Sequence, residues 1–570
     1  MPDQSGVQPL QFACAGGLVL NQSTFAMQPG MAQELVNFEP DINGGYRRIN
    51  GFAKWNDNVV PFTTSDTEKV LMVASFGATD VIAARGESVY ISTNATTALN
   101  GGINNSVTTI TVDDTTGFST AGTLLIGTEQ ITYTGTTATT FTGCTRGANS
   151  TSAASHLDDA DVVETWTSIE SGRTSAGKYT FKRYNFTGTD KIIYADGASK
   201  PSYYDGSTAT QITCSACPSD PALIEVFKNH VFLAGDSTTP EEVYFSAPYS
   251  ESNYQPADGG GSIRIDDEVV ALKVFRDQLY IFGRSRIYRL VGNTVADFQL
   301  QPVTRDIGCV SRFSVQELGG DVIFLAPDGL RTIAGTERIG DVELGTISKA
   351  IQVRFDALTS FDLIDSVVVP NKTQYRIFFV NADDTEANTD GVLASLTQQG
   401  FEFADLKGIR PACTDSDVAK NPEVVLHGGF DGFIYQQEVG NDFNGAAING
   451  KYRSPDLTMG DAGIRKVMQR VILNYAPEAA ISADMFLRYD YEAPSTPRPA
   501  AYPLDSSQVL AIYGVSTYGV STYGGQRQPL VRQPVEGSGF AVAIRVNDDG
   551  VSAPYSLKGF QLEFGVGARR

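Results

Sequence analysis

The chain offers few residues for acid–base or nucleophilic chemistry. It contains only three histidines, His156, His230 and His427. His230 opens the apolar run HVFLAGD, and His427 lies beside two glycines. No serine or cysteine nucleophile motif, GxSxG, HExxH, Walker or dinucleotide-binding pattern occurs in the chain. We therefore interpret His230 and His427 as structural and predict no catalytic residue.

The cysteines follow no metal-binding or redox pattern. Cys214 and Cys217 form a lone CxxC pair among six scattered cysteines, which are too few for a disulfide framework. Zinc would need two further ligands, and a redox role would need a βαβ context, so we expect two free thiols. The remaining cysteines are Cys14, Cys144, Cys309 and Cys413.

Two acidic stretches carry oxygen ligands without a calcium-loop pattern. Asp384, Glu386, Asn388 and Asp390 alternate along DDTEANTDG, but the spacing differs from that of an EF-hand loop. We interpret this stretch as a solvated hairpin tip, and RIDDEVV (264–270) as a charged turn before a strand. We predict no metal and no cofactor.

Composition predicts the elements that would position these residues. The chain has 570 residues, 41% hydrophobic and 19% charged, with 56 glycines and abundant Thr, Ser, Val, Tyr and Phe. Such a composition is typical of strands joined by tight turns, and the length predicts two to four domains. The sequence therefore predicts an all-β fold.

Charge and hydropathy indicate how the chain would relate to DNA, to secretion and to membranes. The net charge of −22 argues against a grip on a phosphate backbone, yet it suits a surface along which DNA slides. A secretory signal requires basic residues near its start, and no basic residue precedes Arg47. No apolar run approaches the ~18 residues of a membrane span. We therefore expect synthesis in a cell's cytoplasm and no membrane span.

A loose repeat predicts a β-propeller. Apolar strands followed by Gly- or Asp-Gly-bearing turns begin 39 to 53 residues apart, which suits one four-stranded blade per repeat. We predict six or seven blades over residues 61–93 and 164–445; an array of β-sandwiches is the alternative. The repeats are KIIYADG, HVFLAGD, QLYIFGRSRIYRL, DVIFLAPDGLRTI, QYRIFFV and EVVLHGGFDGFIYQQ.

Residues 94–163 interrupt the first blade with a Thr- and Gly-rich segment of short alternating strands. The flanking runs YIST and ETWTSI are expected to be neighbours in one sheet, because folds tolerate an insertion best where its ends lie close together. The motifs GTEQITYTG and FTGCTRG, with His156, resemble a small β module that recurs as an insert in phage virion proteins.

The two ends of the chain follow other patterns. Residues 1–60 indicate an arm of short strands that completes a sheet of a distant domain or a neighbouring subunit. Residues 446–570 alternate apolar and polar residues, which predicts a terminal β-sandwich. Within it, YGVSTYGVSTYGG spaces Tyr513, Tyr518 and Tyr523 five apart, and we interpret these tyrosines as an exposed contact loop.

The N-terminal run resembles the start of tail nozzle, or tail tube, proteins of short-tailed bacteriophages, also called packaged-DNA stabilisation proteins. The matching features are Gly16-Gly17, the Phe25–Gly30 turn, ELVNFEPD and GGYRRINGF. Supporting motifs are YNFTGTDKIIYADGASKPSYYDG, FKNHVFLAG, VFRDQLYIFGRSRIYRL and YRSPDLTMGDAGIRKVMQRV, so the resemblance touches most of the chain.

The resemblance implies a structural virion protein and no enzyme. It implies a homohexameric ring below the portal and its adaptor, which closes the channel to retain packaged DNA and conducts that DNA during ejection. It further implies a propeller outside the ring, a platform and channel wall built from both chain ends, and contacts with tail fibres or tailspikes. Arg47 and Arg48, between two glycine turns, are candidates for docking to an adaptor or a neighbouring subunit; an ordinary exposed pair is the alternative.

Two other functions fit the same pattern. One is a propeller that binds host-surface glycans, with the insert and the tyrosine loop as contact surfaces. The other is a propeller glycoside hydrolase or lyase, which would need a carboxylate pair that the sequence does not single out.

Overall fold

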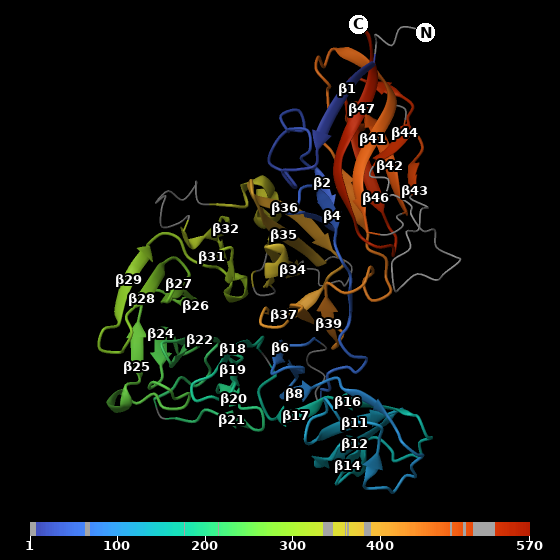
Figure 1. The fold of residues 1–570 in the computed structure, drawn as a ribbon. Helices are drawn as coiled ribbons and strands as arrows, with labels where there is room; N and C mark the ends of the chain where they lie inside the picture. The colour runs from blue at the N-terminus through green and yellow to red at the C-terminus, as the bar shows by residue number, and fades with distance from the viewer. Residues whose placement is uncertain are drawn as a thin grey trace. The chain divides into compact units, whose positions relative to one another are not determined.

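Strands dominate this protein, which confirms the all-β prediction (Figure 1). The structure is a computed structural model that describes residues 7–62, 69–175, 177–214, 216–334, 346–358, 361, 364–380, 389–478, 482–493, 498–505 and 530–569. A five-residue helix, α2 (Gln352–Asp356), interrupts the strands. The chain divides into two compact units: unit 1 (Met1–Ala53, Phe313–Arg410, Gln437–Arg570) and unit 2 (Lys54–Arg312, Pro411–Gln436).

Unit 2 is built like a β-propeller, from antiparallel sheets of four strands each. The first sheet contains β6 (Met72–Phe76), β7 (Asp80–Arg85), β8 (Ser88–Ser92) and β17 (Thr167–Glu170). The second contains β18 (Thr180–Tyr184), β19 (Lys191–Ala195), β20 (Ser202–Tyr204) and β21 (Ala209–Gln211). The third contains β22 (Leu223–Phe227), β23 (His230–Asp236), β24 (Thr239–Phe245) and β25 (Gly261–Arg264).

Two more sheets follow the same plan. One contains β26 (Val269–Phe275), β27 (Gln278–Gly283), β28 (Ile287–Val291) and β29 (Gln299–Thr304). The other joins β37 (Pro411–Asp417), β38 (Val424–Gly429) and β39 (Ile434–Gln437) to β5 (Phe52–Lys54). Consecutive strands pair as hairpins in each sheet, as the strand–turn–strand repeats predict.

The first three sheets of unit 2 are apolar on both faces because each packs between two others. Ile82 of β7 and Ile192 of β19 share one core, whereas Val81 of β7 and Leu426 of β38 share another. Phe232 of β23 and Ile281 of β27 share a third. The alternate sides of β7 thus face different neighbours, so its run reads as continuously apolar. The predicted count of six or seven blades stays a prediction.

The predicted insert is a small β module within unit 2. Its five-stranded sheet contains β9 (Thr96–Ala98), β11 (Gly122–Ile126), β12 (Glu129–Tyr133), β15 (Thr145–Ala148) and β16 (Asp161–Thr165). Its smaller sheet contains β10 (Ile110–Thr111), β13 (Gly135–Thr136) and β14 (Thr140–Thr142), and both sheets share one hydrophobic core. The insert leaves the first blade after β8 and returns before β17, and β8 and β17 pair directly, as predicted.

Unit 1 contains two large sheets. The seven-stranded sheet joins β1 (Val7–Ala13), β3 (Phe38–Pro40), β4 (Tyr46–Arg48), β41 (Ile464–Pro477), β44 (Leu530–Pro534), β45 (Ser538–Gly539) and β47 (Tyr555–Arg569). In Figure 1, β1, β47, β41 and β44 lie side by side in this order. The N-terminal arm therefore completes a sheet of a distant part of the same chain, which was one of the two predicted arrangements.

The nine-stranded sheet combines four consecutive strands from the middle of the chain with strands from both chain ends. It contains β33 (Asp365–Val369), β34 (Gln374–Val380), β35 (Thr389–Thr397), β36 (Gly400–Lys407), β2 (Glu34–Val36), β40 (Gly450–Arg453), β46 (Val542–Asp548), β42 (Ser482–Tyr489) and β43 (Tyr502–Asp505). The Tyr452 ring of β40 stacks on Phe560 of β47, with centroids 5.7 Å apart, so the two sheets form a sandwich.

A three-stranded sheet of β30 (Gln316–Leu318), β31 (Asp321–Ala326) and β32 (Gly329–Thr332) also belongs to unit 1. It lies in the predicted propeller range, as do β33 to β36. The predicted domain boundaries at 60, 93, 163 and 445 stay predictions.

Candidate functional site

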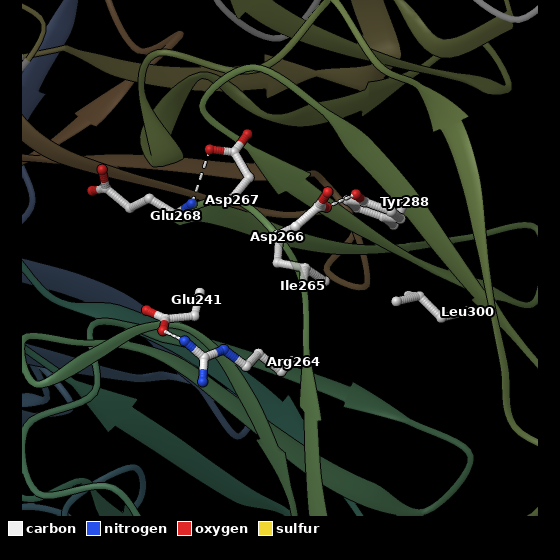
Figure 2. Close-up of a pocket in the computed structure, with 8 residues that line it drawn as sticks. All are labelled: Glu241, Arg264, Ile265, Asp266, Asp267, Glu268, Tyr288 and Leu300. Atoms are coloured by element: carbon white, nitrogen blue, oxygen red, sulfur yellow. Dashed lines mark hydrogen bonds and ion pairs between the residues drawn. The ribbon is translucent and has the colours of Figure 1, made fainter.

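A groove of ≈700 Å³ opens on unit 2 where the third and fourth sheets meet (Figure 2). Its acidic side chains come from the bend between β25 and β26 and from β24. The bend is the RIDDEVV segment, and it is the charged turn before a strand that the sequence predicts. The lining residues are Glu241, Arg264, Ile265, Asp266, Asp267, Glu268, Tyr288 and Leu300.

Asp266 is held by two side chains of the next hairpin. Tyr288 donates its hydroxyl hydrogen to Asp266, and Arg286 forms an ion pair with the same carboxylate. Both contacts stabilise the charged form and hold the pKa of Asp266 below its usual value. Desolvation of the phenol, together with this carboxylate, raises the pKa of Tyr288. Asp266 is therefore ionised at neutral pH.

The other carboxylates of the groove also have partners. Arg284 donates to both oxygens of Glu268, at 2.9 and 3.0 Å, and Arg264 pairs with Glu241. Asp267 accepts from the backbone N–H and hydroxyl of Ser285, at 2.7 and 2.9 Å. The groove thus presents alternating charges, Tyr288 and Leu300, which suit the binding of a polar ligand. Sequence reasoning missed the groove because its walls come from separate hairpins.

Arg48 contradicts both predictions for the Arg47–Arg48 pair, the docking role and the alternative of simple exposure, because its side chain is buried. Arg48 is fully buried; it pairs with Asp548 at 3.5 Å and donates to the carbonyl oxygens of Gly550 and Ser552. Burial lowers the pKa of Arg48 and raises that of Asp548. Arg48 therefore has no surface to offer a partner: alternate residues of a strand face opposite sides, and its side faces the interior of unit 1.

Arg47 is also held by its own chain. It donates to Glu39 at 2.9 Å and to Glu478 at 2.7 and 3.1 Å, and 17% of its side chain is exposed. Lys372 contacts Glu39 and Glu438 at 2.8 and 2.5 Å, so the charges form a continuous network. This network connects β4 to the residues beside β34 and β39, and its role is structural.

The insert contains a second buried cluster, centred on Glu129. Arg146 donates to both Glu129 oxygens, at 2.8 and 2.7 Å, and Nε2 of His156 lies 2.8 Å from the carboxylate. The backbone N–H groups of Gly147 and Ala154 donate to it at 3.0 Å each. Despite burial, these bonds lower the pKa of Glu129 to about 2. The cluster fastens the 144–157 segment, which includes His156, to β12.

The other two histidines are packed inside unit 2. Nδ1 of His230 lies 2.5 Å from the Ser246 carbonyl oxygen. His427 stacks on Tyr435 with centroids 5.0 Å apart, and burial lowers its pKa to about 3. Both placements fit structural roles.

The prediction of two free thiols in the CxxC pair is wrong. Cys214 and Cys217 form a disulfide whose Cα atoms are 5.5 Å apart, whereas Cys14, Cys144, Cys309 and Cys413 are free and buried. The turn brings the two sulfurs together, and a small hydrophobic core lies around them. The absence of a wider cysteine framework therefore did not exclude a local bond.

Other predicted features lie outside the described residues. They are the contact tyrosines Tyr513, Tyr518 and Tyr523, and the side chains of the acidic tip (Asp384, Glu386, Asn388 and Asp390). Among the residues that the structure describes, no group of three or more His, Cys, Asp or Glu side chains could hold a metal ion. Within the same residues, no helix is long and apolar enough to cross a membrane.

No family model matches the chain, and no curated protein matches it. Solved structures that match include the computationally designed Ika8 protein, at 11% identity and a TM-score of 0.33, over 67% of this chain and 100% of that one. Kluyveromyces lactis Hsv2 matches at 10% identity and 0.26, over 60% and 98%. Phanerochaete chrysosporium exo-β-1,3-galactanase matches at 8% identity and 0.23, over 90% and 100%. TM-scores this low support no inference from these proteins to this chain.

Proposed function

We propose that this chain is a structural subunit of a phage tail, a nozzle or hub ring below the portal and its adaptor. In this proposal the ring is a homohexamer of the virion, made in the host cytoplasm. It closes the channel to retain packaged DNA and then conducts that DNA without sequence-specific contacts. The subunit acts as a building element and performs no catalysis.

One observation carries the proposal: three motifs of the resemblance meet at the hydroxyl group of Tyr46. Tyr46 of GGYRRINGF accepts a hydrogen bond from the Gly17 N–H (3.0 Å) and donates to the Gly30 carbonyl (2.7 Å). Three separated parts of the resemblance thus meet at one buried hydroxyl. Their role is architectural, because the bonds fix the path of the N-terminal arm.

Close backbone contacts explain the glycines of these motifs. A Cβ at Gly17 would lie 2.7 Å from the Phe403 backbone nitrogen, and one at Gly30 would lie 2.1 Å from the Ala13 carbonyl oxygen. Both residues have positive φ angles, of 63° and 101°. Only glycine fits such positions without strain. These glycines therefore allow the N-terminal arm to pack closely into unit 1, which suits a structural subunit.

The overall charge of the chain also fits the proposal. The net charge of −22 would keep DNA mobile in a channel, since like charges repel the phosphates.

Negative-stain imaging of the purified protein, alone and mixed with the cognate adaptor–portal complex, tests the proposal. Six-fold rings that stack on that complex are the expected result. Protein that never docks on the complex would overturn it. An unrelated portal complex is the control for non-specific stacking.

The groove supports a second candidate, binding of host-surface glycan, because Tyr288 and alternating charges line it. Glycan hydrolysis is less well supported: a glycosidase needs a carboxylic acid of raised pKa, whereas Tyr288 and Arg286 lower the pKa of Asp266. Isothermal titration with host polysaccharide distinguishes the candidates. Binding that Tyr288→Ala abolishes would favour the glycan candidate; no heat of binding would eliminate it.

A further inference from the structure

The outer face of the seven-stranded sheet differs in charge from the rest of the chain. Its strands β1, β41, β44 and β47 contain six basic residues and one acidic residue, in a chain whose net charge is −22. The basic residues are Arg465, Lys466, Arg470, Arg532, Lys558 and Arg569, and the acidic one is Glu563. Basic residues therefore outnumber acidic ones on these four strands, in contrast to the chain as a whole.

Strand register shows which of these side chains share the outer face. Lys466 is buried, whereas Arg465, Arg470 and Arg532 belong to the opposite set of alternating positions and are exposed. Arg470 lies opposite Glu563 and pairs with it at 3.3 Å. The row of Gln11, Gln561, Ile472 and Arg532 crosses the four strands beside it.

The same face exposes aliphatic side chains. Val7 and Val467 both lie opposite Gly565, and these two valines are 39% and 48% exposed. At the other end, Leu530 is 43% exposed. Arginine is enriched at protein interfaces, and exposed valine and leucine make no favourable contact with a phosphate backbone. The face therefore suits a protein partner better than DNA.

A hollow of ≈160 Å³ lies in this face at Gly559. Gly559 carries no side chain, and its register neighbours are Ala13 on β1 and Asn474 on β41. Gln11, Ile472 and Leu530 also line the hollow. A hollow of this size can accept one side chain of a partner, which is the usual arrangement of an interface anchor.

We propose that this face binds the acidic surface of a second copy of this chain. Charge complementarity selects that occupant, because every other copy is strongly acidic outside this sheet. Two such faces would not bind each other, since arginine would oppose arginine. The contact must join different surfaces, and contacts of this type form a ring when the rotation between successive copies closes. The inference rests on the ring of the proposed function and identifies the surface that builds it.

Charge-changing variants test the inference. Arg532→Glu places a negative charge on β44, and Gln11→Glu places one in the same row on β1. Lys200→Glu is the matched control, because Lys200 is exposed on unit 2. Mass photometry and sedimentation velocity, over a range of concentration and salt, give the oligomeric state. Circular dichroism checks that each variant folds.

We expect the wild-type protein and Lys200→Glu to associate at low salt and to dissociate as salt rises. Arg532→Glu and Gln11→Glu should weaken association by about tenfold or more. Equal association of all four proteins, or a wild-type monomer at every concentration, would overturn the inference. Loss of labelled duplex DNA binding in Arg532→Glu, with association unchanged, would also overturn it and assign the face to nucleic acid.

Imaging with the adaptor–portal complex separates this inference from the proposed function. If wild-type and Arg532→Glu proteins form equal rings there, the surface assignment fails while the tail function stands. If the wild-type protein does not dock, the tail function fails.

Discussion

Replacement of Glu129 by glutamine should loosen the inserted module by about 3 kcal/mol. The Glu129 side chain is 1% exposed, and that of Arg146, which donates to both Glu129 oxygens, is 6% exposed. The substitution therefore leaves a buried guanidinium without its counter-charge. Breaking such a pair costs about 3 to 5 kcal/mol. The pKa of Glu129, lowered from 4.5 to about 2, corresponds to about 3 kcal/mol for the same charge. The cost of the broken ion pair and the free energy from the pKa shift are therefore both about 3 kcal/mol.

The sign of the pH dependence follows from the lowered pKa. The charged form is favoured in the folded state, so the stabilisation is full above pH 4.5 and is lost as pH falls through 2. Glu129→Gln should therefore be destabilised equally at pH 7 and pH 5. The difference in unfolding free energy between Glu129→Gln and the wild-type protein should decrease only in stronger acid, where Glu129 itself takes up a proton.

Hydrogen exchange measured by mass spectrometry reads this module separately from the rest of the chain. Peptides from β11 and β12 should exchange about 100-fold faster in Glu129→Gln, because 1.36 kcal/mol corresponds to tenfold. Asp161→Asn, at an exposed position of β16, is the matched control and should exchange at the wild-type rate. Wild-type exchange in Glu129→Gln would refute the reasoning that the buried carboxylate fastens the module.

Three further predictions concern other buried groups. Arg48→Met should lower the free energy of unfolding by about 3 kcal/mol at pH 7 and by less at pH 4, where Asp548 can take up a proton; urea unfolding at both pH values measures this. His427→Gln should flatten the loss of stability between pH 6.5 and 4, because the wild-type imidazole, with its pKa of about 3, must stay neutral in the folded state while it gains a proton when unfolded; thermal melts over this range detect the slope, and an unchanged slope would contradict the assignment. Alkylation of denatured protein should label four cysteines without reductant and six with it, as mass spectrometry would show; six labels without reductant would exclude the Cys214–Cys217 bond.

Local periodicity made much of the fold predictable. Blade strands such as β7 and β23 are buried on both faces, so each repeat reads as an apolar run that ends in a turn. The insert was predictable because its composition changes abruptly, and because β8 and β17 must pair to keep the first sheet intact. The alternation of apolar and polar residues along β41 and β42 made the sandwich of unit 1 predictable.

Contacts between distant residues were not predictable. Arg48 seemed to belong to an exposed turn because its partner, Asp548, lies 500 residues further along the chain. Charged residues are usually exposed, and a single sequence gives no sign that this one is paired. The groove was missed for the same reason: Asp266 becomes notable only when Arg286 and Tyr288, from the next hairpin, are placed beside it.

The central claim is that this chain retains packaged DNA in a phage tail. Its most direct test is the nuclease sensitivity of virions assembled without this chain, before and after addition of the purified protein. The account predicts that filled heads lose their DNA to the nuclease without the protein and are protected when it is added. Heads that keep their DNA fully protected in its absence would contradict the account.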